Sequence, residues 1–203
     1  MPEEKKYSFQ DRPLLVLDLE TTGLDPAIHE VLEIGAVLCD QRTMKIQGTF
    51  QAKVKPRHIE TAQPRALEVN GYTREAWKYA VWRADAWSSF FAFGRNAVMS
   101  SWNAHFELGF IQPMILDYFP HENDDDLKRF GPFDRHLIDI PSIAWGVLGP
   151  QAKLGKDYIA EAMGLPVEPK PHGALIGALH AYTILKALRF QVGMESEYVE
   201  KAA

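Results

Sequence analysis

The sequence is organised around residues 14–23, LLVLDLETTG, a short apolar run that contains two acids and is bounded by Pro13 and Gly23. A run of this length and composition predicts a buried strand rather than a helix. Because side chains alternate along a strand, Asp18 and Glu20 project from the same face. Paired carboxylates at the end of a buried strand need cations, which predicts a metal site; the alternative is a strand end whose acids point into water.

Length and composition favour one domain with a sizeable core. The chain has 203 residues, 46% of them hydrophobic, and a formal net charge of −5. This charge argues against a protein that coats nucleic acid non-specifically, but it allows an enzyme whose metals offset an acidic cluster. No apolar stretch has transmembrane length and the polar N-terminus lacks a signal-peptide pattern, so we expect no membrane partner and a cytoplasmic location. The single cysteine, Cys39, is expected to be a buried small hydrophobe.

The order of predicted elements indicates a mixed sheet covered on both faces. Strands are expected at residues 14–22, 31–38, 46–54, 97–102 and 136–140. Helices are expected from Thr73 to about Phe91 and at residues 103–118, 142–148, 156–163 and 173–190. The first three strands form a meander and the later ones alternate with helices, which is typical of an α/β domain. We expect a flexible arm over residues 1–12, one domain over 13–192 and a tail over 193–203.

Three spaced motifs carry a family resemblance. The segments DLETTG (18–23), NAHFE (103–107) and HGAL (172–175) resemble, in this order, the three motifs of the DEDDh 3'-5' exonucleases. That family includes ribonuclease T, oligoribonuclease and the proofreading subunit of the bacterial replicative polymerase. Further matches are LEIGA (32–36), VKP (54–56) and VNGYT (69–73). The resemblance covers nearly the whole chain and implies a ribonuclease-H-like α/β fold, with a mixed five-stranded sheet and helices on both faces.

The resemblance also implies a two-metal site. In the family, carboxylates from the motifs hold two divalent ions, Mg²⁺ or Mn²⁺, and a histidine serves as general base. Carried over to this chain, Asp18 would bridge the ions and Glu20 would bind the first of them. Glu107 occupies the position of the second-motif aspartate, and His172 is the expected base.

The third motif departs from the family pattern at Gly177. The family places an aspartate five residues after the histidine, where this chain has glycine. Helix propensity does not explain the change, because glycine costs about 1 kcal/mol relative to alanine inside a helix. His180 lies one turn further on and would be a poor replacement. Asp139 is the more chemical candidate, although in the family that position is more often structural.

Several residues beside the motifs are candidates for substrate contact. The expected set is Leu19, Thr21, Leu24, Asn103 and Phe106. Leu19, Leu24 and Phe106 would wedge or stack terminal bases, with core packing as the alternative for Phe106. A basic run over residues 53–58 would contact phosphates or form a solvated strand end. The acidic tract at 122–126 is expected to be an exposed loop.

Two functions remain open at this stage. The first is a metal-dependent 3'-5' exonuclease that acts on the 3' end of single-stranded DNA or RNA and releases mononucleotides. The second is a catalytically impaired protein of the same fold that binds nucleic acid or a protein partner, which Gly177 and Glu107 favour. The motifs do not separate RNA from DNA. A homodimer is an expectation by analogy with the family.

Overall fold

The computed structural model describes residues 8–120, 130–171 and 173–200, with the side chains of 192–200 left aside. Its centre is a five-stranded sheet of order β3-β2-β1-β4-β5. The strands are β1 (Pro13–Thr21), β2 (Val31–Asp40), β3 (Ile46–Lys53), β4 (Val98–Ser101) and β5 (Leu137–Asp139). β1, β2 and β3 pair antiparallel, as the predicted meander requires, whereas β1, β4 and β5 pair parallel. The central strand β1 is therefore hydrogen-bonded on both sides.

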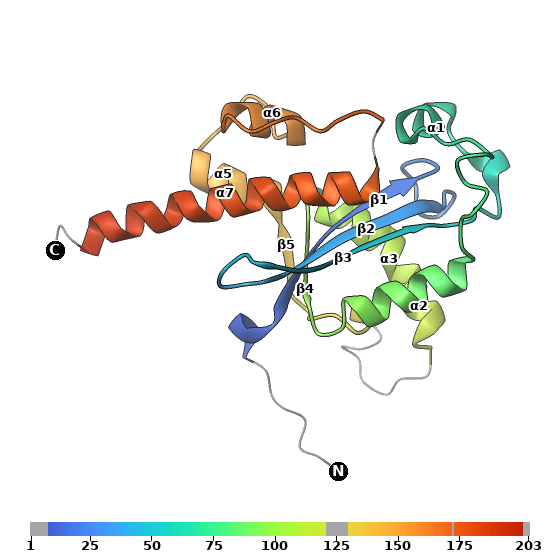
Figure 1. Cartoon of the computed structure of the whole chain (residues 1–203), viewed down its shortest axis with the longest axis horizontal. Helices are drawn as coiled ribbons and strands as arrows, with labels where there is room; N and C mark the ends of the chain where they lie inside the picture. The colour runs from blue at the N-terminus through green and yellow to red at the C-terminus, as the bar shows by residue number, and fades with distance from the viewer. Residues whose placement is uncertain (1–7, 121–129, 172, 201–203) are drawn as a thin grey trace, which may run out of the picture.

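Helices cover both faces of this sheet (Figure 1). They are α1 (Pro64–Asn70), α2 (Arg83–Phe93), α3 (Ala104–Tyr118), α5 (Ile140–Leu148), α6 (Lys156–Ala162) and α7 (Ala174–Glu200), with short 3-10 helices at Phe9–Asp11 and Ile59–Thr61. α2 and α3 lie on one face, and α7 lies on the other with α5 and α6 beside it. The predicted mixed sheet with helices on both faces is confirmed.

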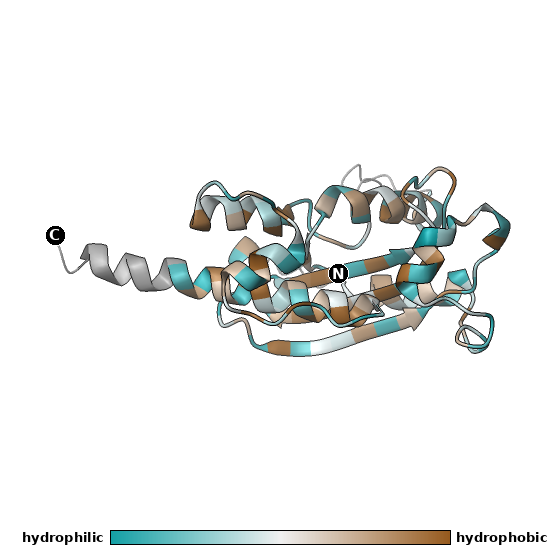
Figure 2. Ribbon diagram, turned by 90° about the horizontal axis from the view of Figure 1, so that it is seen from above, coloured by the Kyte–Doolittle hydropathy of each residue, from teal (hydrophilic) through white to brown (hydrophobic). Residues whose placement is uncertain are grey.

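Alternation along β1 divides the core in two. Leu15 and Leu17 pack in the cluster that contains α2 and α3, whereas Leu14 and Val16 pack in the cluster that contains α5, α6 and α7. Because β1 is covered on both faces, it appears in the sequence as a continuous apolar run. Figure 2 shows hydrophobic residues spread along the strands and the helices that face them. Asp18 continues the Leu14 and Val16 face, so its side chain leaves β1 on the side of α7.

The predicted helix beginning at Thr73 is wrong. Thr73 accepts a hydrogen bond from the Ala76 amide, 3.0 Å, but this closes a turn and the helix begins only at Arg83. Residues 74–79 form turns, and the chain is extended only just before α2, where Val81 pairs with Val54 in an isolated parallel bridge. One long helix and a series of turns followed by a shorter helix place apolar residues at similar spacings, so the periodicity alone did not separate them.

The ends of the described chain are attached to the fold or helical. The Gln41 side chain donates hydrogen bonds to the carbonyls of Phe9 and Arg12, so residues within the expected arm contact the sheet. At the other end, the backbone of α7 stays helical to Glu200, beyond the expected domain boundary. Cys39 is fully buried, as predicted. Within the described ranges, no helix combines the length and the apolar character needed to span a membrane.

Candidate functional site

Three carboxylates from two elements meet at the end of β1. Asp18 and Glu20 leave β1 on the face of α7, and Glu20 is buried with 8% exposure. Glu107 comes from the first turn of α3 and is buried with 5% exposure. Ser101, the last residue of β4, donates a hydrogen bond of 3.0 Å to the Glu107 carboxylate. The parallel pairing of β1 with β4 thus brings the first two motifs together.

Burial and mutual repulsion keep two of these groups protonated near neutral pH. Desolvation, together with the neighbouring charges of Asp18, Glu168 and Glu33, raises the pKa of Glu20 to about 8. Desolvation also raises the pKa of Glu107 to about 8, with Asp18 adding to the effect. Asp18 is therefore the negative charge that raises both pKa values. Such a set of hard oxygen donors fits a divalent cation, which would relieve the repulsion and favour the ionised form of each group.

A lysine stands inside this cluster. Lys156, at the start of α6, places its Nζ 2.7 Å from the Glu168 carboxylate and 3.4 Å from that of Asp18. The Lys156 and Glu168 side chains are 16% and 1% exposed. The charge of Lys156 lowers the pKa of both Glu20 and Glu107, opposing the larger effect of burial. Sequence reasoning did not single out Lys156 or Glu168, and neither belongs to a recognisable motif.

Position 177 faces Asp18, as the resemblance implies. A Cβ added to Gly177 would lie 2.3 Å from Asp18 Oδ2 and 2.7 Å from Asp18 Cγ. These distances are far below van der Waals contact, so the Asp18 carboxylate occupies the space that a side chain at 177 would need. The missing aspartate has therefore left no vacancy beside α7.

The LEIGA segment sets the position of α7. Glu33 is buried with 3% exposure and pairs across the sheet with Glu20. One Glu33 oxygen accepts a hydrogen bond of 2.7 Å from Gln51, and the other accepts one of 3.4 Å from the Ala174 amide at the start of α7. A Cβ on Gly35 would lie 2.0 Å from the Ala174 backbone. Glycine at 35 lets α7 approach the sheet, and Glu33 binds its first turn.

The family model described as exonuclease (RNase_T) matches residues 15–185. The chain belongs to this exonuclease family. The predicted membership of the DEDD-type 3'-5' exonucleases is thereby confirmed.

Relatives and structural neighbours come from DNA and RNA metabolism. The PolC-type DNA polymerase III of Thermotoga petrophila is 33% identical over 160 residues, which are 78% of this chain and 10% of that protein. The zinc-bound complex of E. coli ExoI with single-stranded DNA has a TM-score of 0.73 at 14% identity, and the match covers 94% of this chain and 43% of that one. A 3'-exonuclease with 3'-end specific recognition of a histone mRNA stem-loop has a TM-score of 0.66 at 20% identity, covering 92% and 67%.

These matches bear on the fold. The chain spans about a tenth of the polymerase and under half of the ExoI chain. The ribonuclease-H-like architecture predicted from the motifs is the fold of these exonuclease neighbours. At such low identity, the structural neighbours establish this architecture alone.

The other acids and histidines considered from the sequence lie outside the three-carboxylate cluster or outside the described residues. Asp139 caps α5 by accepting a hydrogen bond from the Ser142 amide, 3.1 Å, and it also accepts one from the Ala104 amide at the start of α3, 3.3 Å. Asp139 therefore binds backbone amides at the starts of both α5 and α3. His180 Nε2 lies 2.8 Å from the Pro166 carbonyl. The predicted base His172 lies outside the described residues, and so does the acidic tract at 122–126.

The residues predicted to contact substrate differ in exposure. Leu19 is buried in the core at 6% exposure, whereas Leu24 is 73% exposed. The Thr21 hydroxyl donates to the Gly23 carbonyl, 2.7 Å, inside the turn that follows β1. The Asn103 carbonyl accepts from the amides that open α3. Phe106 packs on Phe110 with ring centroids 5.0 Å apart, which fits the core-packing alternative. Leu24 and Asn103 are thus the exposed members of the set, and their contact with substrate stays a prediction.

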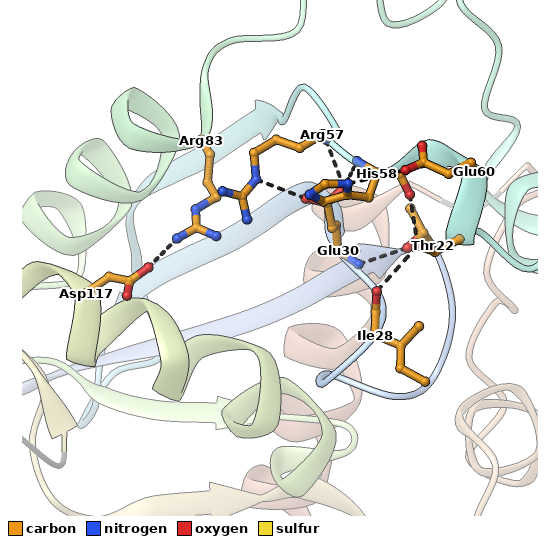
Figure 3. A network of polar contacts seen from close by, with 9 residues as sticks. Thr22, Ile28, Glu30, Arg57, His58, Glu60, Arg83 and Asp117 are labelled. Atoms are coloured by element: carbon orange, nitrogen blue, oxygen red, sulfur yellow. Dashed lines mark hydrogen bonds and ion pairs between the residues drawn. The ribbon is translucent and has the colours of Figure 1, made fainter.

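The predicted basic run lies beside a separate pocket of about 290 Å³. This pocket is lined by the β1–β2 loop, α2, α3 and residues of the basic run itself between 54 and 58, and none of the three site carboxylates lines it. Arg57 forms an ion pair with Glu30, 3.3 Å, and Arg83 forms one with Asp117 (Figure 3). Lys55 lies over the Trp82 ring, 4.1 Å from its centroid. Since Arg57 and Lys55 have partners within the protein, contact of the run with phosphates stays a prediction.

Proposed function

We propose that this chain hydrolyses phosphodiester bonds from the 3' end of single-stranded nucleic acid with the help of divalent metal ions. One observation supports this most strongly: Asp18, Glu20 and Glu107 form a buried carboxylate cluster in which two pKa values are raised to about 8. A protein core stabilises such a cluster poorly without added cations. The cluster also coincides with the first two motifs of the exonuclease family.

The proposed ligands are Asp18, Glu20 and Glu107, and the proposed ions are Mg²⁺ or Mn²⁺. A bound ion of this kind supplies charge stabilisation for a phosphodiester and a more acidic water. The chain itself holds the donors in place, since Ser101 fixes Glu107 and the pairing of β1 with β2 fixes Asp18 and Glu20. His172 is proposed as the base that accepts the proton of the attacking water, because histidine titrates near neutral pH.

The proposed substrate is a single-stranded 3' end. ExoI binds single-stranded DNA in its structure, and another neighbour recognises the 3' end of an mRNA stem-loop. The matched PolC-type relative is a DNA polymerase. We propose a single strand as the common element of these substrates, with Leu24 placed to contact the terminal base. The cytoplasmic location and the homodimer stay predictions.

A second candidate function is binding without turnover. Two observations favour it: Gly177 replaces a family ligand, and Lys156 already contacts Asp18 at 3.4 Å. On this alternative the protein retains affinity for single strands but does not cleave them.

Cleavage of oligonucleotides labelled at the 5' end separates the two functions. With Mn²⁺, the unmodified chain is expected to shorten single-stranded DNA or RNA from the 3' end, one nucleotide at a time. Asp18→Asn should lower the rate about a hundredfold or more, because several kcal/mol of charge stabilisation depend on the metal ligands. Glu68→Gln, a change at an exposed carboxylate outside the buried cluster, serves as the matched control.

Comparing DNA with RNA in this assay identifies the sugar that the protein accepts. If the unmodified chain cleaves no faster than Asp18→Asn while it still binds the oligonucleotide, the enzyme assignment is wrong and the binding function stands.

A further inference from the structure

The carboxylate site contains a cation supplied by the chain itself. Lys156 Nζ lies between the Asp18 and Glu168 carboxylates, at 3.4 Å and 2.7 Å. Lysine is rarely buried without acidic partners, because desolvation of its charge is costly. Here the side chain reaches from the first residue of α6 to the end of β1, across 138 positions of sequence. The lysine is thus a built part of the site.

Glu168 adds a further carboxylate to the site. It lies in the segment between α6 and α7, nine positions before Gly177. Its amide donates a hydrogen bond of 3.1 Å to Asp157, which fixes the segment against α6. Its charge raises the pKa of Glu20, so Glu168 is electrostatically part of the same cluster. Glu33 acts on Glu20 in the same way, so Asp18, Glu20 and Glu107 have two further carboxylates beside them, although residue 177 supplies none.

An ammonium group and a divalent ion compete for the same oxygens. An ion that joined the Asp18 and Glu168 carboxylates would sit about 2.0–2.2 Å from an oxygen of each, in the space that Nζ now fills. Gly177 supports this arrangement, because the absence of a side chain lets the Asp18 carboxylate lie against α7. Glycine at position 177 and the ammonium group of Lys156 thus both fit the same position of the Asp18 carboxylate.

We propose that the Lys156–Glu168 ion pair replaces the second metal ion, so that this site binds one divalent ion where the family resemblance implies two. The inference rests on the metal site of the proposed function. It assigns the single ion to Asp18, Glu20 and Glu107, and the position beside Glu168 to the lysine ammonium.

Calorimetric titration with Mn²⁺, on the full chain without nucleic acid, tests the stoichiometry. The unmodified protein should bind one ion. Lys156→Met removes the charge but keeps an apolar side chain of similar length, and it should bind two, because the ammonium group no longer competes with a second ion for the Asp18 and Glu168 oxygens. Lys156→Met combined with Glu168→Gln should return to one ion, since a ligand of the second ion is lost.

Two controls keep the result interpretable. Lys156→Arg retains the positive charge and should still bind one ion. Circular dichroism establishes that each variant is folded; if Lys156→Met does not fold, Lys156→Gln takes its place. If Lys156 only stabilises the fold, its removal should lower stability without adding a bound ion.

The outcomes separate this inference from the proposed function. Two ions on the unmodified chain, or one ion on folded Lys156→Met, overturn the replacement by lysine and leave the exonuclease assignment intact. No bound ion on the unmodified chain overturns the metal site itself and therefore both.

A neighbouring cluster supplies the last arm of the test. Asp157, Glu168 and His180 offer ligand atoms within 4.8 Å of one another. If His180→Gln abolishes binding of the single ion and Asp18→Asn does not, the ion belongs to this neighbouring cluster and both assignments fail. The expected result is the reverse, with Asp18→Asn abolishing binding and His180→Gln leaving it unchanged.

Discussion

Asp18 lies against α7 because residue 177 has no side chain. Gly177→Ala adds a Cβ that would lie 2.3 Å from Asp18 Oδ2, so the carboxylate must move. Alanine usually stabilises a helix interior by about 1 kcal/mol relative to glycine. We expect Gly177→Ala to lose this gain and to weaken Mn²⁺ binding by about tenfold, which corresponds to about 1.4 kcal/mol. Urea unfolding and calorimetry measure the two effects.

Gly146 provides the matched control at the residue scale. It also lies in a helix, α5, but a Cβ there would meet nothing within 4 Å. Gly146→Ala should therefore stabilise the protein by up to about 1 kcal/mol and leave Mn²⁺ binding unchanged. Equal stabilisation by both changes would show that Asp18 moves aside at no cost, contrary to the packing argument.

Single residues were predictable where their chemistry follows from local spacing. Asp18 and Glu20 share a face because strands alternate, whereas Glu107 was assigned to the site by the motif resemblance and not by its position in the first turn of a helix. Lys156 and Glu168 were not predictable in this way, because a lysine at a helix start resembles any solvated lysine. Their role depends on a contact between residues 138 positions apart, which no local pattern encodes.

At the scale of elements, the fit of α7 on β2 depends on Gly35. A Cβ at this position would lie 2.0 Å from the backbone of Ala174, and a helix backbone cannot give way as a side chain can. Overpacking of this kind costs about 1–3 kcal/mol or more. We expect Gly35→Ala to lower the free energy of unfolding by at least this amount, measured by urea unfolding.

Gly48 in β3 is the control for this change. Its Cβ would meet only the Phe93 ring, at 3.3 Å, and a ring edge can shift by a few tenths of an ångström. Gly48→Ala should therefore change stability by less than about 1 kcal/mol. If both variants lose a similar free energy of unfolding, the effect comes from replacing glycine in a strand and not from the contact between Gly35 and α7.

Helices and strands were predictable where the turn residues at their ends agree with the spacing of the apolar residues between them. The five strands were found close to their observed bounds because each is a short apolar run with polar or glycine-containing ends. The helix expected from Thr73 failed because the bridge between Val54 and Val81 is a tertiary contact. Its consequence, an extended segment before Arg83, cannot be read from local periodicity.

At the scale of the whole molecule, the buried glutamates make stability depend on pH. The pKa values of Glu20 and Glu107 rise from 4.5 in the unfolded chain to about 8 in the fold. Between these values the folded protein holds protons that the unfolded chain releases, so stability falls as pH rises from about 4.5 to about 8 and levels off above. Each group contributes up to about 1.4 kcal/mol per pH unit in this window.

Thermal unfolding in a chelator, followed across this pH range, measures the effect. Mn²⁺ should stabilise the protein more at pH 8 than at pH 5, because the ion binds the ionised carboxylates. Glu20→Gln combined with Glu107→Gln should flatten the pH dependence. The charge of Lys156 is constant here, because its pKa is raised above 10.5 by its acidic partners. A stability that rises with pH in the chelator would contradict the protonated state of the two glutamates.

The parts of the site also differ in how readily they unfold locally, because some belong to β1 and others do not. Asp18 and Glu20 pair with β2 and continue the central strand, which is covered on both faces, so they belong to the part of a protein that exchanges its amide hydrogens last. Lys156 belongs to α6, which is outside the sheet and rests on the core through Ile159 and Ala160. A fluctuation that lifts α6 would carry the ammonium away and leave the carboxylates in place. The readiness of the site to accept a further ion is therefore tied to the local unfolding of one short helix.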